Sequence, residues 1–300
     1  MTLRHLLEVD DLTPDEVTAV LDAAEAPDPP QVLARKGVAL VFEKPSARTR
    51  NSMELAVVQL GGHPVSIRGE EVAIDVRESA EDVARTLACY HAAIGARVFE
   101  HDKVERMAAV SHVPVVNLLS DDAHPCQALA DLLTIRQRFG SFAGRTVAYV
   151  GDFNNVARSL AIGAALVGLS VRVACPPGHG PSAADLDRIR AAGVELLVTH
   201  RPEEAADGAD VVYADVWASM GQEAEAAARK LAFEGFTVDD ALMARAASDA
   251  VFLHCLPAHR GDEVAASVCD GPQSLIWQLA ENRMHAQRGL LVWLLQQAPG

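Results

Sequence analysis

The fold is decided by a stretch that reads Val38-Ala39-Leu40-Val41-Phe42-Glu43-Lys44-Pro45-Ser46-Ala47-Arg48-Thr49-Arg50. Its first five residues are apolar, as in a buried strand, and Pro45 then turns the chain. Hydroxyl side chains follow where a helix begins. A strand, a polar turn and a helix in this order form the building unit of an α/β fold.

The same alternation continues along all 300 residues. We predict strands at Val38–Phe42, Ala92–Val98, Val113–Leu119, Thr146–Val150, Val171–Ala174, Val194–Val198, Asp210–Ala214 and Ala250–His254. We predict helices at Thr49–Leu60, Ala80–Tyr90, Gln127–Phe139, Asn155–Val167, Ala183–Ala192 and Gln278–Leu295. Because strands alternate with helices, the sheets should be parallel and covered by helices.

The length of the chain, 300 residues, suggests two domains of roughly 150 residues each. The segment Phe139-Gly140-Ser141-Phe142-Ala143-Gly144 interrupts the pattern before a new strand. We therefore place a first domain at residues 1–138 and a second at residues 139–300. Both should be doubly wound parallel-sheet domains. The last helix, at about residues 278–297, has no strand after it and is expected to pack back on the first domain.

The charge and the cysteines exclude several classes of protein. A net charge of −15 disfavours nucleic acid and anionic membranes as partners, because both require basic patches. The five cysteines contain no C-x-x-C pair, which argues against a disulfide framework and a structural zinc site. Neither a signal peptide nor an apolar run of about 18 residues is apparent. We therefore expect a soluble, cytoplasmic protein that acts on small molecules.

Polar clusters follow five of the predicted strands, at the point where each strand ends. They are Glu43–Arg50, Ser120–Gln127, Gly151–Asn155, Asp215–Gly221 and Cys255–Arg260. In open parallel sheets, ligands bind beyond the carboxyl ends of the strands. Clusters from both halves therefore predict one cleft between two domains, although polar loops also follow strands where no ligand binds.

The first cluster predicts an anion site. Free N–H groups and the helix dipole attract anions to a helix start. Arg48 and Arg50 are unfavourable in the first turn unless an anion is present, and arginine suits bidentate phosphate contacts. The alternative is a capping serine followed by two solvated arginines. The pattern is not a Walker A loop.

Two further clusters offer amide and imidazole groups. His124 and Gln127 could both donate to a carbonyl oxygen on which charge develops; the alternative is a capping or surface histidine. Because no second histidine follows at the fourth position, a metal site is disfavoured. Gly151–Asn155 lacks G-x-G-x-x-G, so we reject a nicotinamide site. Asn154 or Asn155 would cap a helix or bind a carboxylate.

The last two clusters combine a carboxylate and a thiol. Asp215 lies at a strand end, where it could hold an ammonium group. Cys255 is near His254 and His259 in sequence, which raises the possibility of a nucleophile. A buried cysteine at a strand end is more often inert, however, and we favour that interpretation.

Together these clusters resemble the carbamoyltransferases, specifically the ornithine carbamoyltransferases, from Leu6 to Leu295. The motifs of that family are S-T-R-T-R, A-R-V, H-P-x-Q, D-x-W-x-S-M-G, H-C-L-P and E-N-R-x-H. They correspond here to Ser46–Arg50, Arg97, His124–Gln127, Asp215–Gly221, His254–Pro257 and Glu281–His285. The D-x-W-x-S-M-G and H-C-L-P motifs are similar to those of ornithine enzymes rather than aspartate or putrescine enzymes.

The resemblance implies transfer of a carbamoyl group from carbamoyl phosphate to the δ-amine of ornithine. Carbamoyl phosphate would be bound by Ser46, Ala47, Arg48, Thr49, Arg97, His124, Gln127, Cys255, Leu256 and Arg283. Ornithine would be bound by Asn117, Asn155, Asp215, Ser219 and Met220, with Asp215 and Ser219 on the α-amino group and the two asparagines on the carboxylate. Catalysis would depend on Arg48, Arg97, His124, Gln127 and Cys255. No metal or organic cofactor is required, because positioning and electrostatics can supply the acceleration.

The resemblance also implies a trimer, or an assembly of trimers, and a role in arginine metabolism. Three departures from the family pattern stand out: Ala47 replaces a threonine, Phe153 replaces a glycine, and Glu71–Glu78 lacks the glutamine that a neighbouring subunit usually offers. Arg68 or Arg77 could replace that glutamine. The rival interpretations are a carbamoyltransferase for another amine, such as putrescine or an acylated ornithine, and a non-catalytic homologue that binds carbamoyl phosphate.

Ala47→Thr should tighten the binding of carbamoyl phosphate by a factor of about 5 to 20, because the restored hydroxyl adds roughly 1 kcal/mol or somewhat more of charge-assisted hydrogen bonding. The affinity for ornithine should change little. Calorimetric titration of carbamoyl phosphate, or of a phosphonate analogue, into both proteins measures the effect. Weaker binding by the variant would mean that another group, such as Arg68 or Arg77, has taken over this contact.

Overall fold

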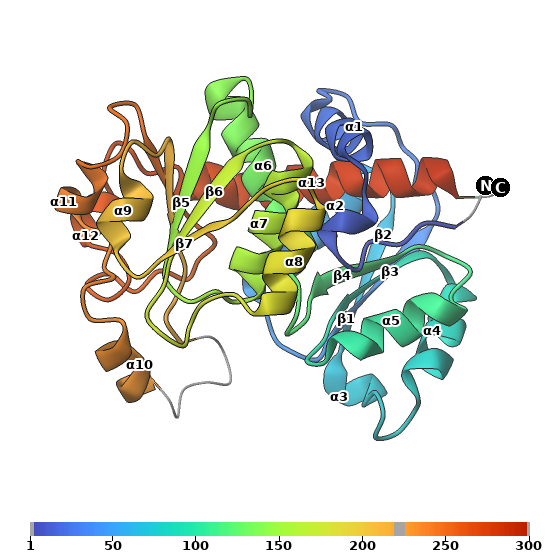
Figure 1. The fold of residues 1–300 in the computed structure, drawn as a ribbon. Helices are drawn as coiled ribbons and strands as arrows, with labels where there is room; N and C mark the ends of the chain where they lie inside the picture. The colour runs from blue at the N-terminus through green and yellow to red at the C-terminus, as the bar shows by residue number, and fades with distance from the viewer. Residues whose placement is uncertain (1–2, 219–225, 299–300) are drawn as a thin grey trace. The chain divides into compact units, whose positions relative to one another are not determined.

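The computed structural model describes residues 3–218 and 226–298 of the chain. The chain divides into two compact units, Met1–Leu133 with Glu281–Gly300, and Thr134–Ala280, here called unit 1 and unit 2. Each is built around one parallel sheet (Figure 1). The parallel-sheet α/β class expected from the sequence is therefore confirmed. The domain boundary at residues 138 and 139 stays a prediction.

Unit 1 contains a four-stranded sheet in the order β2-β1-β3-β4. The strands are β1 (Gly37–Phe42), β2 (His63–Arg68), β3 (His91–Arg97) and β4 (Val115–Leu119). The helices are η1 (Val9–Asp11), α1 (Pro14–Glu25), α2 (Ala47–Gln59), α3 (Gly69–Val72), α4 (Ala80–Ala88) and α5 (His101–Val110). The helices α4 and α5 pack against each other and against β3 and β4, where Val41, Ile94 and Val104 belong to one buried core (Figure 1).

Unit 2 contains a five-stranded sheet in the order β7-β6-β5-β8-β9. The strands are β5 (Thr146–Val150), β6 (Ser170–Ala174), β7 (Leu197–Thr199), β8 (Val211–Ala214) and β9 (Val251–His254). The helices are α7 (Asn155–Leu166), α8 (Ala183–Ala191), α9 (Pro202–Ala206), α10 (Ala226–Ala232), α11 (Asp240–Met243) and α12 (Ala266–Cys269). Trp217, Phe233 and Phe252 lie in its core, and Trp217 stacks on Phe233.

Two helices cross the boundary between the units, α6 (Pro125–Phe139) and α13 (Ile276–Gln297). The part of α13 in unit 1 packs on α1 at Gly289. A Cβ atom at this position would meet the backbone of α1, at Val20 O and, 2.6 Å away, at Ala24 N. Only glycine therefore permits this close helix contact. Among the described residues, no helix is long and apolar enough to cross a membrane.

The strand β2 is the one that the sequence pattern did not predict. Its residues His63–Arg68 include a proline and are only half-buried, because β2 lies at the edge of the sheet and pairs with β1 alone. An edge strand tolerates Pro64, which a central strand would exclude. The apolar run that marks the other strands is consequently missing.

The parallel arrangement brings the loops that carry the candidate residues to one edge of each sheet. In unit 1 Ser46 follows β1, Arg97 ends β3, and His124 follows β4. In unit 2 Asp215 follows β8 and Cys255 follows β9, two strands that pair directly.

Gly289→Ala should lower the free energy of unfolding by about 1–3 kcal/mol, because the added methyl group overpacks the contact between α1 and α13. The sign of the change in stability is diagnostic. In a helix interior, replacing glycine by alanine normally raises the free energy of unfolding by about 1 kcal/mol. Urea denaturation of both proteins measures the difference. A variant that is more stable than the parent would contradict this account of the helix contact.

Candidate active site

The loop after β1 leads into the start of α2, where the sequence predicts an anion site. Ser46 caps the helix and accepts a hydrogen bond from Thr49 N over 3.3 Å. Thr49 is fully buried, whereas Arg48 and Arg50 are exposed. Arg50 pairs with Glu54 one turn later, so its charge is used within α2. Of the two arginines that made the first turn unusual, Arg48 therefore remains the better candidate for a ligand contact.

Two other arginines that the motifs single out are buried in unit 1. Arg97, at the end of β3, and Arg283, in α13, are 5% and 4% exposed. Arg283 donates to Thr49 Oγ1 over 2.7 Å and to Gln127 Oε1. The structure thus joins residues from α2, α6 and α13 that lie far apart in the sequence. A cluster of guanidinium and hydroxyl groups of this kind is suited to phosphate.

His124 begins the turn into α6 and is 4% exposed. Burial holds the pKa of its imidazole well below the ordinary value, and the charges of Arg283 and Arg97 lower this pKa further. Both causes favour the neutral ring. A neutral imidazole can still donate one N–H to a ligand oxygen, which is what a carbonyl oxygen with developing charge needs.

Lys44 is a candidate that the sequence pattern did not single out. Burial, and then the charge of Arg97, lower the pKa of its ammonium group. Its Nζ lies 4.4 Å from the centroid of the Phe99 ring. Lys44 therefore adds to the positive potential around Arg97. The sequence does place Lys44 in the same loop as Ser46. It does not indicate that Lys44 lies close to Arg97.

Asn117 lies in β4 and is fully buried. Its Nδ2 donates to Leu7 O and to Ser120 Oγ, each over 3.0 Å. Both hydrogens of the amide are thereby engaged within unit 1. To bind the carboxylate of ornithine, Asn117 would have to donate a hydrogen bond. This role stays a prediction, and the contacts within unit 1 do not favour it.

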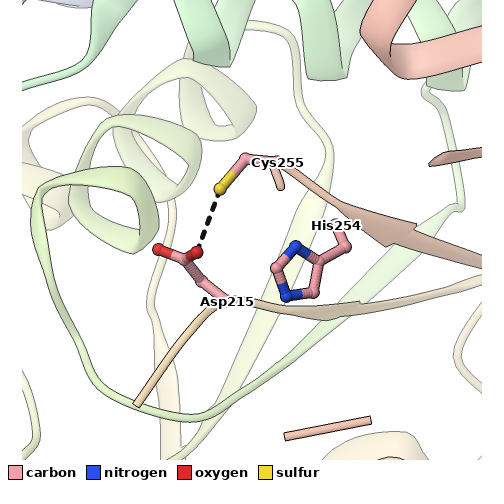
Figure 2. A group of neighbouring side chains, drawn as sticks. All are labelled: Asp215, His254 and Cys255. Carbon is pink, nitrogen blue, oxygen red and sulfur yellow. Dashed lines mark hydrogen bonds between the residues drawn. The ribbon is translucent and has the colours of Figure 1, made fainter. Parts of the chain in front are cut away.

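The central feature of unit 2 is a contact between a thiol and a carboxylate (Figure 2). Cys255 Sγ donates to Asp215 Oδ1 over 3.0 Å, and both residues are buried. Asp215 also accepts hydrogen bonds from Asn154 Nδ2 and from Val216 N, each over 2.8 Å. Because the thiol donates its hydrogen, Cys255 is protonated here, which agrees with an inert cysteine rather than a nucleophile.

His254 completes a group of three whose ligand atoms lie within 4.8 Å of one another, close enough to hold a metal ion (Figure 2). Both of its ring nitrogens have other partners, however. Nδ1 accepts from Leu256 N over 2.9 Å, and Nε2 faces Glu263 Oε1 at 3.2 Å. The ring therefore supports the turn at Leu256 rather than offering a free nitrogen to a cation.

The remaining candidates for the amine substrate are placed only in part. Asn154, not Asn155, caps α7, with Oδ1 accepting from Val156 N and Ala157 N. Asn155 is the first residue of α7 and is half-buried. Leu256 is half-buried in the turn after β9, with a left-handed φ of 64°. Ser219 and Met220 lie outside the described residues.

Fold and site together define an α/β protein whose buried arginines and hydroxyl groups suit a phosphate-like anion. Comparison with known proteins agrees. Residues 4–137 match the carbamoyl-P binding domain of aspartate/ornithine carbamoyltransferase, and residues 143–294 match the Asp/Orn binding domain of the same family. The chain belongs to the aspartate/ornithine carbamoyltransferase family, which confirms the resemblance found in its motifs.

Individual relatives cover the chain from end to end. The ornithine carbamoyltransferase of Acidothermus cellulolyticus is 52% identical over 307 residues, 99% of this chain and 98% of that protein. The enzyme of the same name from Parafrankia sp. is 48% identical over 309 residues, with the same shares covered. Among solved structures, ornithine carbamoyltransferase from Pyrococcus furiosus superposes with a TM-score of 0.94 at 42% identity, and both chains are covered completely.

The imidazole of His124 should remain neutral at pH 6, below the usual histidine pKa of about 6.5. The unfolded chain takes up a proton as the pH falls through about 6.5, whereas folded His124 does not, so this residue lowers the free energy of unfolding in that range. Nitrogen chemical shifts of histidine, assigned with a His124→Gln variant, measure the ring state. A ring that is protonated at pH 6 would contradict the assignment.

Proposed function

We propose that the chain transfers the carbamoyl group of carbamoyl phosphate to the δ-amine of L-ornithine, which gives L-citrulline and phosphate. The observation that carries the proposal is the burial of Arg97, His124 and Arg283 in unit 1, where Arg283 also donates to Thr49 and Gln127. Buried cations of this kind are stable only when an anion or a dense set of acceptors compensates them. Relatives that share about half of the residues are named ornithine carbamoyltransferases.

The anion half of the reaction belongs to unit 1. Ser46, Thr49, Arg48 and Arg283 hold the phosphate, while Arg48, Arg97, His124 and Gln127 face the carbonyl oxygen. As the amine attacks the carbamoyl carbon, charge grows on this oxygen and then passes to the departing phosphate. Donors fixed in advance around the oxygen lower the barrier because they need not reorganise during the reaction.

The amine half belongs to unit 2. The Asp215 carboxylate binds the α-ammonium group of ornithine together with Ser219, and Asn155 binds its carboxylate. Met220 packs on the side chain. The δ-amine must lose its proton before it attacks the carbamoyl carbon. Cys255 and the Leu256 carbonyl face this amine. No covalent intermediate is required, because the amine attacks the carbamoyl carbon directly.

We also propose a cytoplasmic homotrimer, or an assembly of trimers, that acts in arginine metabolism. Exposed apolar side chains on α2, Leu55 and Val58, each 52% exposed, suit a contact between copies. Arg68 pairs with Glu70 and Glu71 of its own chain, so of the two arginines proposed to replace the missing glutamine we favour Arg77. Light scattering of the purified protein tests the trimer.

Asp215→Asn should lower kcat/KM for ornithine by about 100-fold, because an ammonium group then loses its buried counter-charge. The affinity for carbamoyl phosphate should stay within about three-fold, since that ligand is held by unit 1. Steady-state assays of citrulline formation, with calorimetry of carbamoyl phosphate as the control, separate the two effects.

The parent protein should also prefer ornithine to putrescine, N-acetylornithine, lysine and aspartate; a preference for putrescine would overturn the ornithine assignment.

A further inference from the structure

The side chain of Gln127 lies between a buried anion and a buried cation. Its Nε2 donates to Asp131 Oδ1, one helical turn later in α6, over 2.8 Å. Its Oε1 accepts from Arg283 Nη1 of α13. Asp131 is 0% exposed and Gln127 1% exposed, so neither contact is screened by solvent.

This arrangement fixes which way the amide points. A carboxylate only accepts hydrogen bonds and a guanidinium only donates them. If the amide of Gln127 turned over, its oxygen would face the oxygens of Asp131 and its NH2 group would face Arg283. Both contacts would then be repulsive. The charges on either side therefore select a single orientation of the amide.

The selected orientation leaves one donor for a ligand. Nε2 carries two hydrogens, and Asp131 uses one of them. The second can donate to an oxygen of the substrate. In the opposite orientation Gln127 would present an acceptor, which repels a carbonyl oxygen with growing negative charge.

We propose that Asp131 is a positioning residue: it holds Gln127 so that the second N–H of its amide donates to the carbonyl oxygen of carbamoyl phosphate. This inference rests on the proposed function, because it assigns a support to one of the donors of that reaction. Asp131 does not touch the substrate. It acts only through the amide of Gln127.

The charge of Asp131 makes the effect of its removal distinctive. Asp131→Asn eliminates a buried negative charge that contacts Gln127, which in turn contacts Arg283, so the surroundings become more positive and inorganic phosphate should bind as tightly as before or more tightly. The Gln127 amide is no longer fixed, because asparagine offers both a donor and an acceptor. The kcat should therefore fall by about ten-fold or more while phosphate affinity is kept.

A double-mutant cycle with Gln127→Ala tests the route of the effect. If Asp131 acts through Gln127, Asp131→Asn should lower kcat by less than about two-fold once Gln127 is alanine. The matched control is Asp210→Asn in unit 2. Asp210 is also a buried carboxylate, bonded to Arg145 Nη1 over 2.6 Å and to Thr146 N over 2.8 Å, but it lies at the other end of β8 from Asp215. Its variant should lose stability and keep kcat.

Asp131→Glu keeps a carboxylate acceptor and should retain kcat within about three-fold of the parent, which keeps the test open if Asp131→Asn does not fold. Additive losses in the cycle, a parallel loss of kcat and phosphate affinity in Asp131→Asn, or a glutamate variant as impaired as Gln127→Ala would each overturn the proposal. A parent protein that binds phosphate but carbamoylates no ornithine would instead refute the proposed function.

Discussion

The structure of unit 1 depends on the burial of positive charge. Arg97 and Arg283 are almost completely removed from solvent, and a charge that is buried without compensation costs several kcal/mol or more. Thr49 and Gln127 accept hydrogen bonds from Arg283, and a bound phosphate would supply the opposite charge. Burial lowers the pKa of His124, and the same positive charges lower it further. These charges also explain how a chain with a net charge of −15 can still attract an anion, because the attraction is local to these residues.

Unit 2 is also built on a parallel sheet, but its candidate site places a negative charge rather than positive charges. Its parallel strands β8 and β9 pair along their length, so the residues that follow them, Asp215 and Cys255, come into contact. A carboxylate that accepts from a thiol, an asparagine and a backbone N–H is well suited to an ammonium ligand, because these uncharged donors orient it and leave its negative charge in place. His254 and Glu263 support the turn behind this contact.

Much of this organisation could be predicted from the sequence, and the exceptions have physical causes. Strands such as Thr146–Val150 can be predicted from the sequence because a strand buried on both faces needs a continuous apolar run. The edge strand β2 does not need such an apolar run, and its Pro64 further argues against a strand in the sequence. Short motifs identified Thr49 and Arg283, but not that they share a hydrogen bond, since that pairing depends on how distant helices pack. The contact between Gln127 and Asp131 lies one turn apart within α6, a spacing that the sequence does show. The engagement of both Asn117 hydrogens, by contrast, was invisible in the sequence.

The central claim is that the buried arginines of unit 1 form a pocket that an anion of the phosphate class completes. The most direct measurement is the thermal midpoint of the purified protein during titration with carbamoyl phosphate, inorganic phosphate or sodium chloride at constant ionic strength. A ligand that binds only the folded state stabilises it by about 2.7 kcal/mol at a concentration one hundred times its Kd. Carbamoyl phosphate and phosphate should therefore raise the midpoint by several degrees, whereas chloride should not. A midpoint that none of the three ligands moves, or that chloride raises equally, would contradict the account.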